Sequence, residues 1–227
     1  MIDRRARFLE RDPVSITELE SSESVDAVPV EFSRVEMTGS LARERTVFVG
    51  PRAPPKHSDA FNDRKVSAEK SGYYVFTPLK WSDDDDTSEI LLCEGWLPTS
   101  RVNSMVDDWS RNRVVRVAGV VRTGETQPPY TTLDPDIGRR RFFWIDMERM
   151  SDLAKIKRSR TYYVSALEIE GDDARVEKNK MAAVPVRKPL DAHMDFYVSP
   201  WHHVGYAATW FTLSAATLLM AAVKLRR

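Results

Sequence analysis

The sequence predicts a β-rich α+β protein, with an antiparallel sheet or partly closed barrel-like extramembrane domain, short helices and one C-terminal transmembrane helix. Two observations support this fold class. Most segments before residue 200 alternate apolar with polar residues or are rich in β-branched and aromatic side chains, as strands are. Residues 204–223 form a run of twenty residues without a charge. Several short strands separated by turns favour a barrel or sandwich over a parallel sheet.

Length and composition limit the class of protein. The chain has 227 residues, enough for one domain and a further segment. Lys and Arg total 34, as do Asp and Glu, so the formal charge is zero and we expect no nucleic-acid partner. The single cysteine, Cys93, excludes an internal disulfide and a multi-cysteine metal site within one chain.

Each predicted strand carries β-branched or aromatic residues, and together the strands cover 30–39, 46–50, 73–81, 89–98, 113–123, 140–146 and 161–170. Helical patterns are fewer. Residues 1–20 mix apolar residues with many charges, and residues 100–110 begin with a Ser that can cap a helix. Residues 147–156 repeat apolar side chains at helical spacing.

Three polar stretches, 51–65, 82–86 and 171–180, predict loops. The acidic run SDDDD at 82–86 suits a cation site or a solvated hairpin tip. Calcium loops space their acids with other ligands and a glycine, so the tip is favoured. From these patterns we expect three parts: a charged, partly helical segment (1–27), the extramembrane β-rich domain (28–200), and the transmembrane helix with a basic tail (201–227).

Residues 204–223 predict a membrane-spanning helix, because twenty residues at 1.5 Å each span about 30 Å, one hydrocarbon core. Its hydroxyl side chains can bond back to helix carbonyls. A buried core helix is the alternative, but a helix that is apolar all round is rare in a small domain. Lys224, Arg226 and Arg227 follow, and the positive-inside rule places them on the cytoplasmic or matrix side, opposite the main domain.

A stripe of small residues runs along this helix. Ala208, Thr212 and Ala216 lie at i, i+4 and i+8, a spacing that lets two backbones approach closely. Because no second such helix is visible in the sequence, we expect the partner to be a transmembrane helix of another chain.

Catalytic motifs are not visible: the sequence has no GxSxG, HExxH or Gly-rich phosphate loop, so we expect no enzyme. Residues 139–160 carry eight basic and three acidic residues. This stretch suits lipid headgroups, haem propionates or an acidic partner, or else forms a solvated face. His193, His202 and His203 fall within eleven residues and are the main concentration of potential metal or haem ligands.

Six segments resemble, in order, those of the Surfeit-locus protein one family, the cytochrome c oxidase assembly factors. The C-terminal HHVGYAATWFTLSAAT resembles the family signature (N/E)HLxYxxTWYxLSAAT. Upstream, the matching segments are VEMTGSLARERTVFVGPR, GYYVFTPL, LLCEGWLP, VAGVVRTGETQPPY and FFWIDMERM. Family members carry a first transmembrane helix that this sequence lacks, so the chain is truncated or split, or has lost that anchor. The family's FxPxN stretch is altered at 130–134, and Phe142 replaces the first Trp of WxWxD.

The resemblance implies an assembly factor for cytochrome c oxidase that aids haem a insertion or stabilises an early assembly intermediate. It implies the mitochondrial inner membrane, with the main domain facing the intermembrane space. The implied partners are cytochrome c oxidase subunits or assembly intermediates, membrane lipid and another transmembrane helix. The alternatives are a permanent accessory subunit of a respiratory complex (the oxidase or a supercomplex) with a structural role and, less favoured, an enzyme acting on haem or a quinone.

The family histidine falls on His203, and Tyr206 and Trp210 share its helix face at i+3 and i+7. One interpretation makes these three residues transient contacts of haem a, with His203 as an axial ligand. The other makes them an interfacial belt that holds the helix at its depth. His202 and His193 are expected to be surface residues of the approach to the membrane.

Overall fold

The computed structural model describes residues 2–22, 31–55, 69–82, 87–103, 114–127, 129, 133–171, 185–194 and 200–226. The chain forms two compact units, Met1–Met194 and Asp195–Arg227. The acidic run at 83–86, the altered family segment at 130–132 and most of the predicted helix at 100–110 lie outside the described residues.

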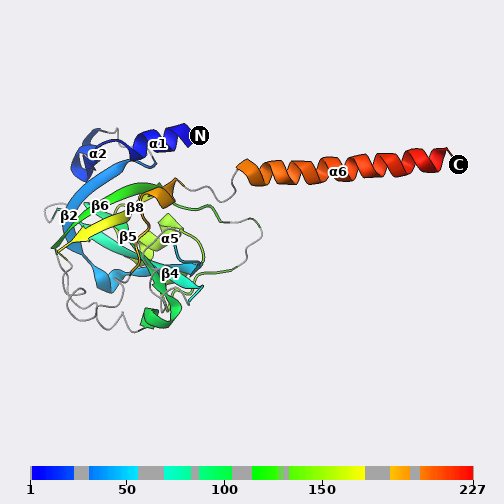
Figure 1. Cartoon of the computed structure of the whole chain (residues 1–227). Helices are drawn as coiled ribbons and strands as arrows, with labels where there is room; N and C mark the ends of the chain where they lie inside the picture. The colour runs from blue at the N-terminus through cyan, green and yellow to red at the C-terminus, as the bar shows by residue number, and fades with distance from the viewer. Residues whose placement is uncertain are drawn as a thin grey trace. The chain divides into compact units, whose positions relative to one another are not determined.

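The first unit combines short helices with a curved sheet (Figure 1). Its strands are β1 (Val14–Ser15), β2 (Arg34–Leu41), β3 (Val47–Arg52), β4 (Gly72–Lys80), β5 (Glu89–Pro98), β6 (Val114–Thr123), β7 (Arg141–Phe142) and β8 (Tyr162–Glu170). Its helices are α1 (Ile2–Leu9), α2 (Ile16–Ser22) and α5 (Met147–Leu153), with 3₁₀ turns η1 (Arg43–Arg45), η3 (Thr99–Arg101) and η5 (Asp191–His193). The second unit contains α6 (Pro200–Leu225).

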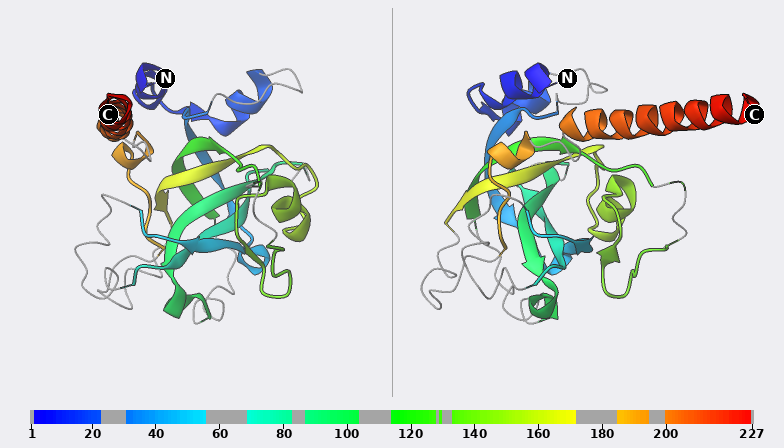
Figure 2. Two further views of the ribbon diagram at one scale, coloured as in Figure 1. Left: turned by 90° about the vertical axis from the view of Figure 1, so that its right-hand side faces the viewer. Right: turned by 45° about the vertical axis from the view of Figure 1, so that its right-hand side comes forward.

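The sheet is ring-like without closing into a complete barrel, which confirms the predicted fold class. Its order is β1-β2-β6-β8-β5-β4-β3-β7, and β2 also pairs with β4 at Ser40↔Lys80 and Leu41↔Leu79. Gly39 permits this approach, since a Cβ there would lie 2.2 Å from the Lys80 carbonyl oxygen. The pairings are antiparallel except β1–β2, β5–β8 and β3–β7, which are parallel. Figure 2 shows the strands curving around one another.

One predicted strand ends earlier than expected, and another begins later. The strand predicted at 140–146 is wrong beyond Phe142, because the chain turns there and Asp146 caps α5 by accepting a hydrogen bond from the Arg149 amide at 3.1 Å. The strand predicted from residue 30 begins at Arg34, because Phe32 adopts a left-handed conformation with φ 76°. The other long strands match their predicted ranges within two residues.

The hydrophobic residues divide between two sides of the sheet. Alternate positions of β5 show this: Ile90 and Leu92 join one cluster, and Leu91 and Cys93 join the other. The first cluster draws on strands all round the ring, so it fills the centre of the ring. The second lies between the sheet and α5. With both faces covered, every residue of β5 is buried.

An ion pair is buried within the sheet. An Arg43 nitrogen lies 3.3 Å from Glu94 Oε2, and both side chains are almost inaccessible to solvent. The hydroxyl of Thr77 donates to Glu94 Oε1 at 2.6 Å, and Thr77 and Thr46 share a further hydrogen bond. These hydrogen bonds satisfy the carboxylate, which a buried charge requires.

Residues 185–194, here called the strap, cross one end of β5. Trp96 and Val186 exchange two backbone hydrogen bonds of 2.7 Å. The neighbouring Gly95 has φ +140°, and a Cβ at that position would lie 2.5 Å from the Val186 carbonyl oxygen. Only glycine adopts this conformation without strain, so Gly95 is what permits the strap to dock. The last turn of the strap is η5, which ends at His193.

A polar contact holds α2 against the sheet. Glu20 accepts hydrogen bonds from Arg160 at 2.8 and 3.0 Å and also from the Tyr162 hydroxyl. Burial opposes ionisation of Glu20, but the hydrogen bonds from Arg160 and Tyr162 and the charge of Arg160 outweigh it and lower the Glu20 pKa.

Candidate functional site

The C-terminal helix α6 is long and apolar enough to cross a membrane. Within Trp201–Leu225, the most apolar 18 residues have a mean hydropathy of 1.4, and none of them is buried within the protein. The hydroxyls of Thr209, Thr212 and Thr217 donate to helix carbonyls four residues earlier, at 2.7 to 3.0 Å. These three hydroxyls are therefore bonded within the helix itself, as a lipid environment requires, and the apolar helix indicates membrane anchoring.

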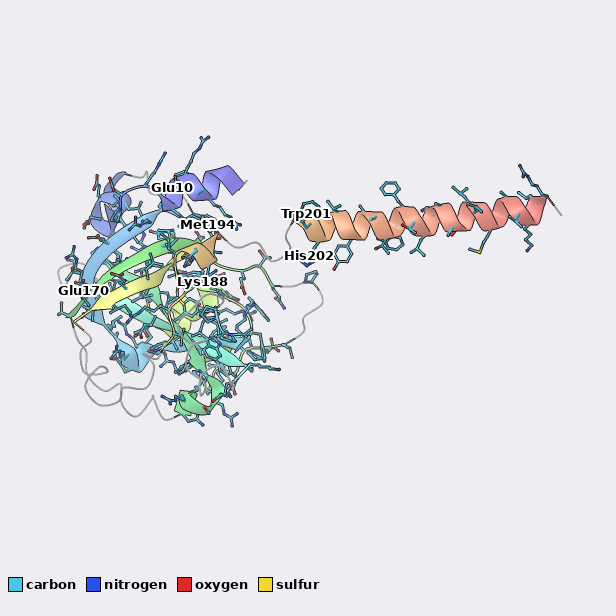
Figure 3. All side chains as sticks on the ribbon, in the orientation of Figure 1. Glu10, Glu170, Lys188, Met194, Trp201 and His202 are labelled. Atoms are coloured by element: carbon cyan, nitrogen blue, oxygen red, sulfur yellow. The ribbon has the colours of Figure 1, made fainter. Side chains whose placement is uncertain are left out.

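Three residues predicted as haem contacts lie in the first turns of this helix. His203, Tyr206 and Trp210 have exposed side chains, and their spacing places them on one face. Figure 3 labels Trp201 and His202 at the start of the same helix. His202 lies about 100° around the helix from His203, so the two imidazoles point in different directions.

The predicted packing stripe on α6 is formed by small side chains. Ala208, Thr212 and Ala216 are all exposed within this chain, and the Thr212 hydroxyl is bonded to the Ala208 carbonyl at 2.7 Å. Because the hydroxyl is directed back at its own helix, the stripe presents mainly methyl groups and backbone. Such a surface suits close contact with another helix.

His193 is buried, so its prediction as a surface residue is wrong. Only 2% of it is exposed, because η5 turns it back against the end of β6. Its Nδ1 lies 3.4 Å from an Arg122 nitrogen. Burial lowers the pKa of His193 to about 3; the charges of Lys188 and Arg122 add to this effect, and the Lys188 backbone opposes it. His193 is therefore a neutral structural imidazole.

Arg122 links the strap to α1. Its guanidinium lies 4.7 Å above the ring of Phe32, and the Arg5 guanidinium from α1 lies 4.5 Å from the centre of the same ring. Arg122 Nε also donates to Glu31 at 3.1 Å. Sequence reasoning missed this stack of Arg5, Phe32 and Arg122. The available signal was a charged residue at the end of an apolar strand, Val120-Val121-Arg122, which predicts a paired cation.

The basic side chains of residues 139–160 are only partly exposed. Arg160 is buried against Glu20, and Arg140 donates to the carbonyl oxygens of Glu44 and Leu153. Arg139 and Arg149 remain exposed, next to Asp136 and Asp146 respectively. Of the eight basic residues in this stretch, Arg160 is buried, Arg140 and Arg141 are half-buried, and the other five are exposed.

Metal and thiol chemistry have little support in the described part of the chain. Within it, no group of three or more His, Cys, Asp or Glu side chains could hold a metal ion. Cys93 is fully buried, and burial raises the pKa of its thiol to about 12. The thiol is therefore protonated and shielded from solvent. The candidate site that the sequence predicts is the exposed face of His203 on α6.

Comparison with known proteins gives the family. A family model described as the SURF1 family matches residues 1–215. The chain belongs to the SURF1 family. It is 26% identical to Surfeit locus protein 1 of Arabidopsis thaliana over 239 residues, which covers 87% of this chain and 62% of that protein.

Two SURF1-like proteins give similar matches. The chain is 25% identical to that of Monosiga brevicollis over 201 residues, covering 86% of this chain and 67% of the relative. It is 23% identical to that of Drosophila melanogaster over 196 residues, covering 85% and 58%. The chain thus spans less than two thirds of the Arabidopsis and Drosophila proteins.

The SURF1-like segments fall on the main elements of this fold. GYYVFTPL forms most of β4, LLCEGWLP most of β5, and VAGVVRT the second part of β6. The last two segments carry Gly95, which receives the strap, and Arg122, which contacts it. The motifs of this SURF1-family chain therefore include residues that join the β-rich unit to the segment leading into α6.

Proposed function

We propose that this protein is an assembly factor for cytochrome c oxidase that aids haem a insertion or stabilises an early assembly intermediate. The SURF1-family match over residues 1–215 is the observation that carries this proposal. An apolar helix that could span a membrane fits the same role, because haem a and the oxidase core are membrane-bound substrates and partners. The proposal includes the mitochondrial inner membrane, oxidase subunits or assembly intermediates as partners, and no catalytic turnover.

The first turns of α6 have side chains that fit haem a as a transient cargo. The ring of haem supplies four nitrogens to its own iron, so one imidazole is enough to hold it axially. His203 is exposed, and the exposed rings of Tyr206 and Trp210 follow on its face. The imidazole would bind through one nitrogen while the other donates to a carbonyl or water. The two aromatic rings would cover the apolar macrocycle.

The packing stripe of Ala208, Thr212 and Ala216 also favours a second candidate, a permanent accessory subunit of a respiratory complex. A close helix contact would hold the chain in a stable complex without any role in haem handling. Recovery of the purified oxidase distinguishes the two. An accessory subunit is recovered in equal amounts with the other subunits, whereas an assembly factor is present in intermediates and absent from the mature enzyme.

Substitution of His203 tests the haem interaction. If His203 is an axial ligand, His203→Ala should abolish the Soret absorption of haem a that copurifies with the protein, and should lower the amount of assembled oxidase. His202→Ala is the matched control, because it removes the neighbouring imidazole from a different face. It should change neither measurement.

The interfacial belt predicts a different pattern. Both histidine substitutions would then change membrane stability slightly, Trp210→Ala would change it more, and no haem signal would be lost. Equal haem a binding by wild type and His203→Ala in detergent, with unchanged oxidase levels, would rule out the ligand role. The accessory-subunit function would then be the better explanation.

A further inference from the structure

A hairpin over residues 133–143 carries most of the exposed large apolar side chains of the first unit. Within the described part of that unit, five such side chains are exposed, and three of them, Leu133, Ile137 and Phe143, lie in this hairpin. The other two, Val114 and Met194, lie elsewhere in the chain. Single exposed apolar residues are ordinary, whereas a concentration of them marks a contact surface.

Backbone hydrogen bonds hold the two arms of the hairpin together. Asp136 and Arg141 exchange two bonds, of 2.8 and 2.9 Å. The residues between them form a turn that begins at Ile137, which therefore lies at the tip. Leu133 precedes Asp136 by three steps along the chain, and Phe143 follows Arg141 by two. At 3.8 Å per step each lies within about 11 Å of the paired residues, so the three apolar residues share one small region.

Two arginines fix the hairpin to the rest of the first unit. Arg140 donates to the carbonyl oxygens of Glu44 at 3.0 Å and of Leu153 at 2.8 Å. The Arg141 guanidinium lies 5.0 Å from the centre of the Tyr73 ring. The exposed apolar side chains are thus held in place before any partner binds, which lowers the entropy cost of binding.

The charges beside these apolar residues favour a protein partner over a lipid surface. The side chain of Arg139, next to the tip, is 73% exposed, and its only ion pair among the described residues is with Asp136 Oδ2, at 3.9 Å. So long and exposed a contact is weak, which leaves the guanidinium able to pair with a partner's carboxylate. Asp134 and Asp136 are exposed on the same hairpin, and an anionic bilayer would repel both. Arginines beside exposed aromatic rings are typical of protein interfaces.

A second copy of this chain is a poor match for the hairpin. A two-fold contact between hairpin tips would bring the two Arg139 side chains toward one another. A head-to-tail contact would need another apolar surface to receive the tip. In the part of the first unit that the structure describes, the remaining exposed large apolar residues are Val114 and Met194, which are far apart in the sequence. The partner must therefore be another protein that supplies both apolar area and a carboxylate.

We propose that the hairpin 133–143 is a docking site for a protein that offers an apolar pocket with a carboxylate at its edge. Ile137 would enter the pocket, and Arg139 would pair with the carboxylate. The inference rests on the proposed function, in which the partner is a subunit or assembly intermediate of cytochrome c oxidase.

Photocrosslinking from the tip tests this contact. Ile137→Cys and Val114→Cys variants of the full chain are labelled with benzophenone maleimide, and native Cys93 stays unlabelled because it is buried. The labelled proteins are mixed with detergent-solubilised membranes that contain oxidase intermediates, irradiated, and probed with antibodies against the oxidase core subunits. Position 137 should give about fivefold or more adduct with a core subunit than the exposed control position 114. Equal adducts at the two positions, or adducts of position 137 only with lipid or a second copy, would overturn the proposal.

Charge variants then test the role of Arg139. Copurification of oxidase core subunits with the full chain should fall about fivefold or more in Arg139→Glu, whereas Arg139→Lys should retain it because lysine preserves the charge. Arg149→Glu is the matched control, since Arg149 is also exposed and lies 3.6 Å from an aspartate three residues earlier. It should have no effect. Copurification at the wild-type level in both Ile137→Ser and Arg139→Glu would overturn the hairpin contact alone. A wild-type chain that copurifies no core subunit would overturn the proposed function together with it.

Discussion

At the scale of single residues, His193 couples the stability of the β-rich unit to pH. Its pKa is about 3 in the folded protein, against 6.5 for a free imidazole. Between these values the unfolded chain binds a proton that the folded chain does not. The free energy of unfolding therefore falls as the pH drops below about 6.5, by up to ~1.4 kcal/mol per pH unit.

His193→Gln removes this titration and tests it. Between pH 7 and pH 5, wild type should lose about 2 kcal/mol more of its free energy of unfolding than the variant. Urea unfolding in detergent, followed by tryptophan fluorescence, measures the difference. The difference between the two proteins isolates His193, because every other titratable group is common to both. Parallel pH profiles for the two proteins would mean that His193 is solvated in solution.

At the scale of elements, Gly95 decides whether the strap can dock. Gly95→Ala adds a Cβ 2.5 Å from the Val186 carbonyl oxygen in a backbone conformation, φ +140°, that alanine disfavours. The strap must then shift and strain its two hydrogen bonds to Trp96. We expect a loss of about 2 kcal/mol or more in the free energy of unfolding.

Gly138→Ala provides the control for that substitution. Gly138 lies on an exposed turn, and the nearest atom to a Cβ there would be Asp136 Oδ1 at 3.6 Å, an ordinary contact. The change in unfolding free energy should stay within about 0.5 kcal/mol. If urea denaturation gives similar values for both variants, the strap does not depend on Gly95.

The stripe on α6 gives a prediction about helix association. Thr212→Leu adds bulk in the middle of Ala208, Thr212 and Ala216, so it should release the protein from its complex while membrane insertion stays intact. Thr217→Leu is the matched control, since Thr217 makes the same hydroxyl-to-carbonyl bond and lies about 140° away around the helix. Copurification and carbonate extraction measure the two effects. Copurification of Thr212→Leu at the wild-type level would argue against the stripe.

The sequence predicted those elements that are determined by neighbouring residues, and it did not predict those that depend on distant contacts. The strands β4, β5, β6 and β8 followed from alternation and β-branched residues, and α6 from a charge-free run. The two-residue strand β7 did not, because its range is set by a turn and by the cap of α5 at Asp146. The parallel β5–β8 pairing was also not predictable, since it joins strands that no local signal connects.

At the scale of the whole molecule, one part of the candidate site could be predicted from the sequence and another part could not. The resemblance placed the family histidine on His203, and the spacing along one helix then grouped Tyr206 and Trp210 with it. The burial of His193 could not be predicted from the sequence, because Arg122 lies 71 residues earlier and the strap brings the two side chains together. A histidine near an apolar helix has no local pattern that separates a surface position from a core position.

The orientation of the whole chain in its membrane is a further prediction. The basic tail of Lys224, Arg226 and Arg227 beside a charge-free span should lie in the matrix, with the β-rich domain in the intermembrane space. Protease added to mitoplasts should therefore digest the domain. Digestion only after the inner membrane has been opened would reverse this topology.

The pairing of Trp96 with Val186 has a consequence for biosynthesis. Trp96 and Val186 are 90 positions apart in the sequence, so this pairing closes a long loop and cannot form before Val186 has been synthesised. Val186 precedes the first residue of α6 by 14 positions. The β-rich unit therefore cannot complete this pairing until nearly all of the chain before its anchor has been made.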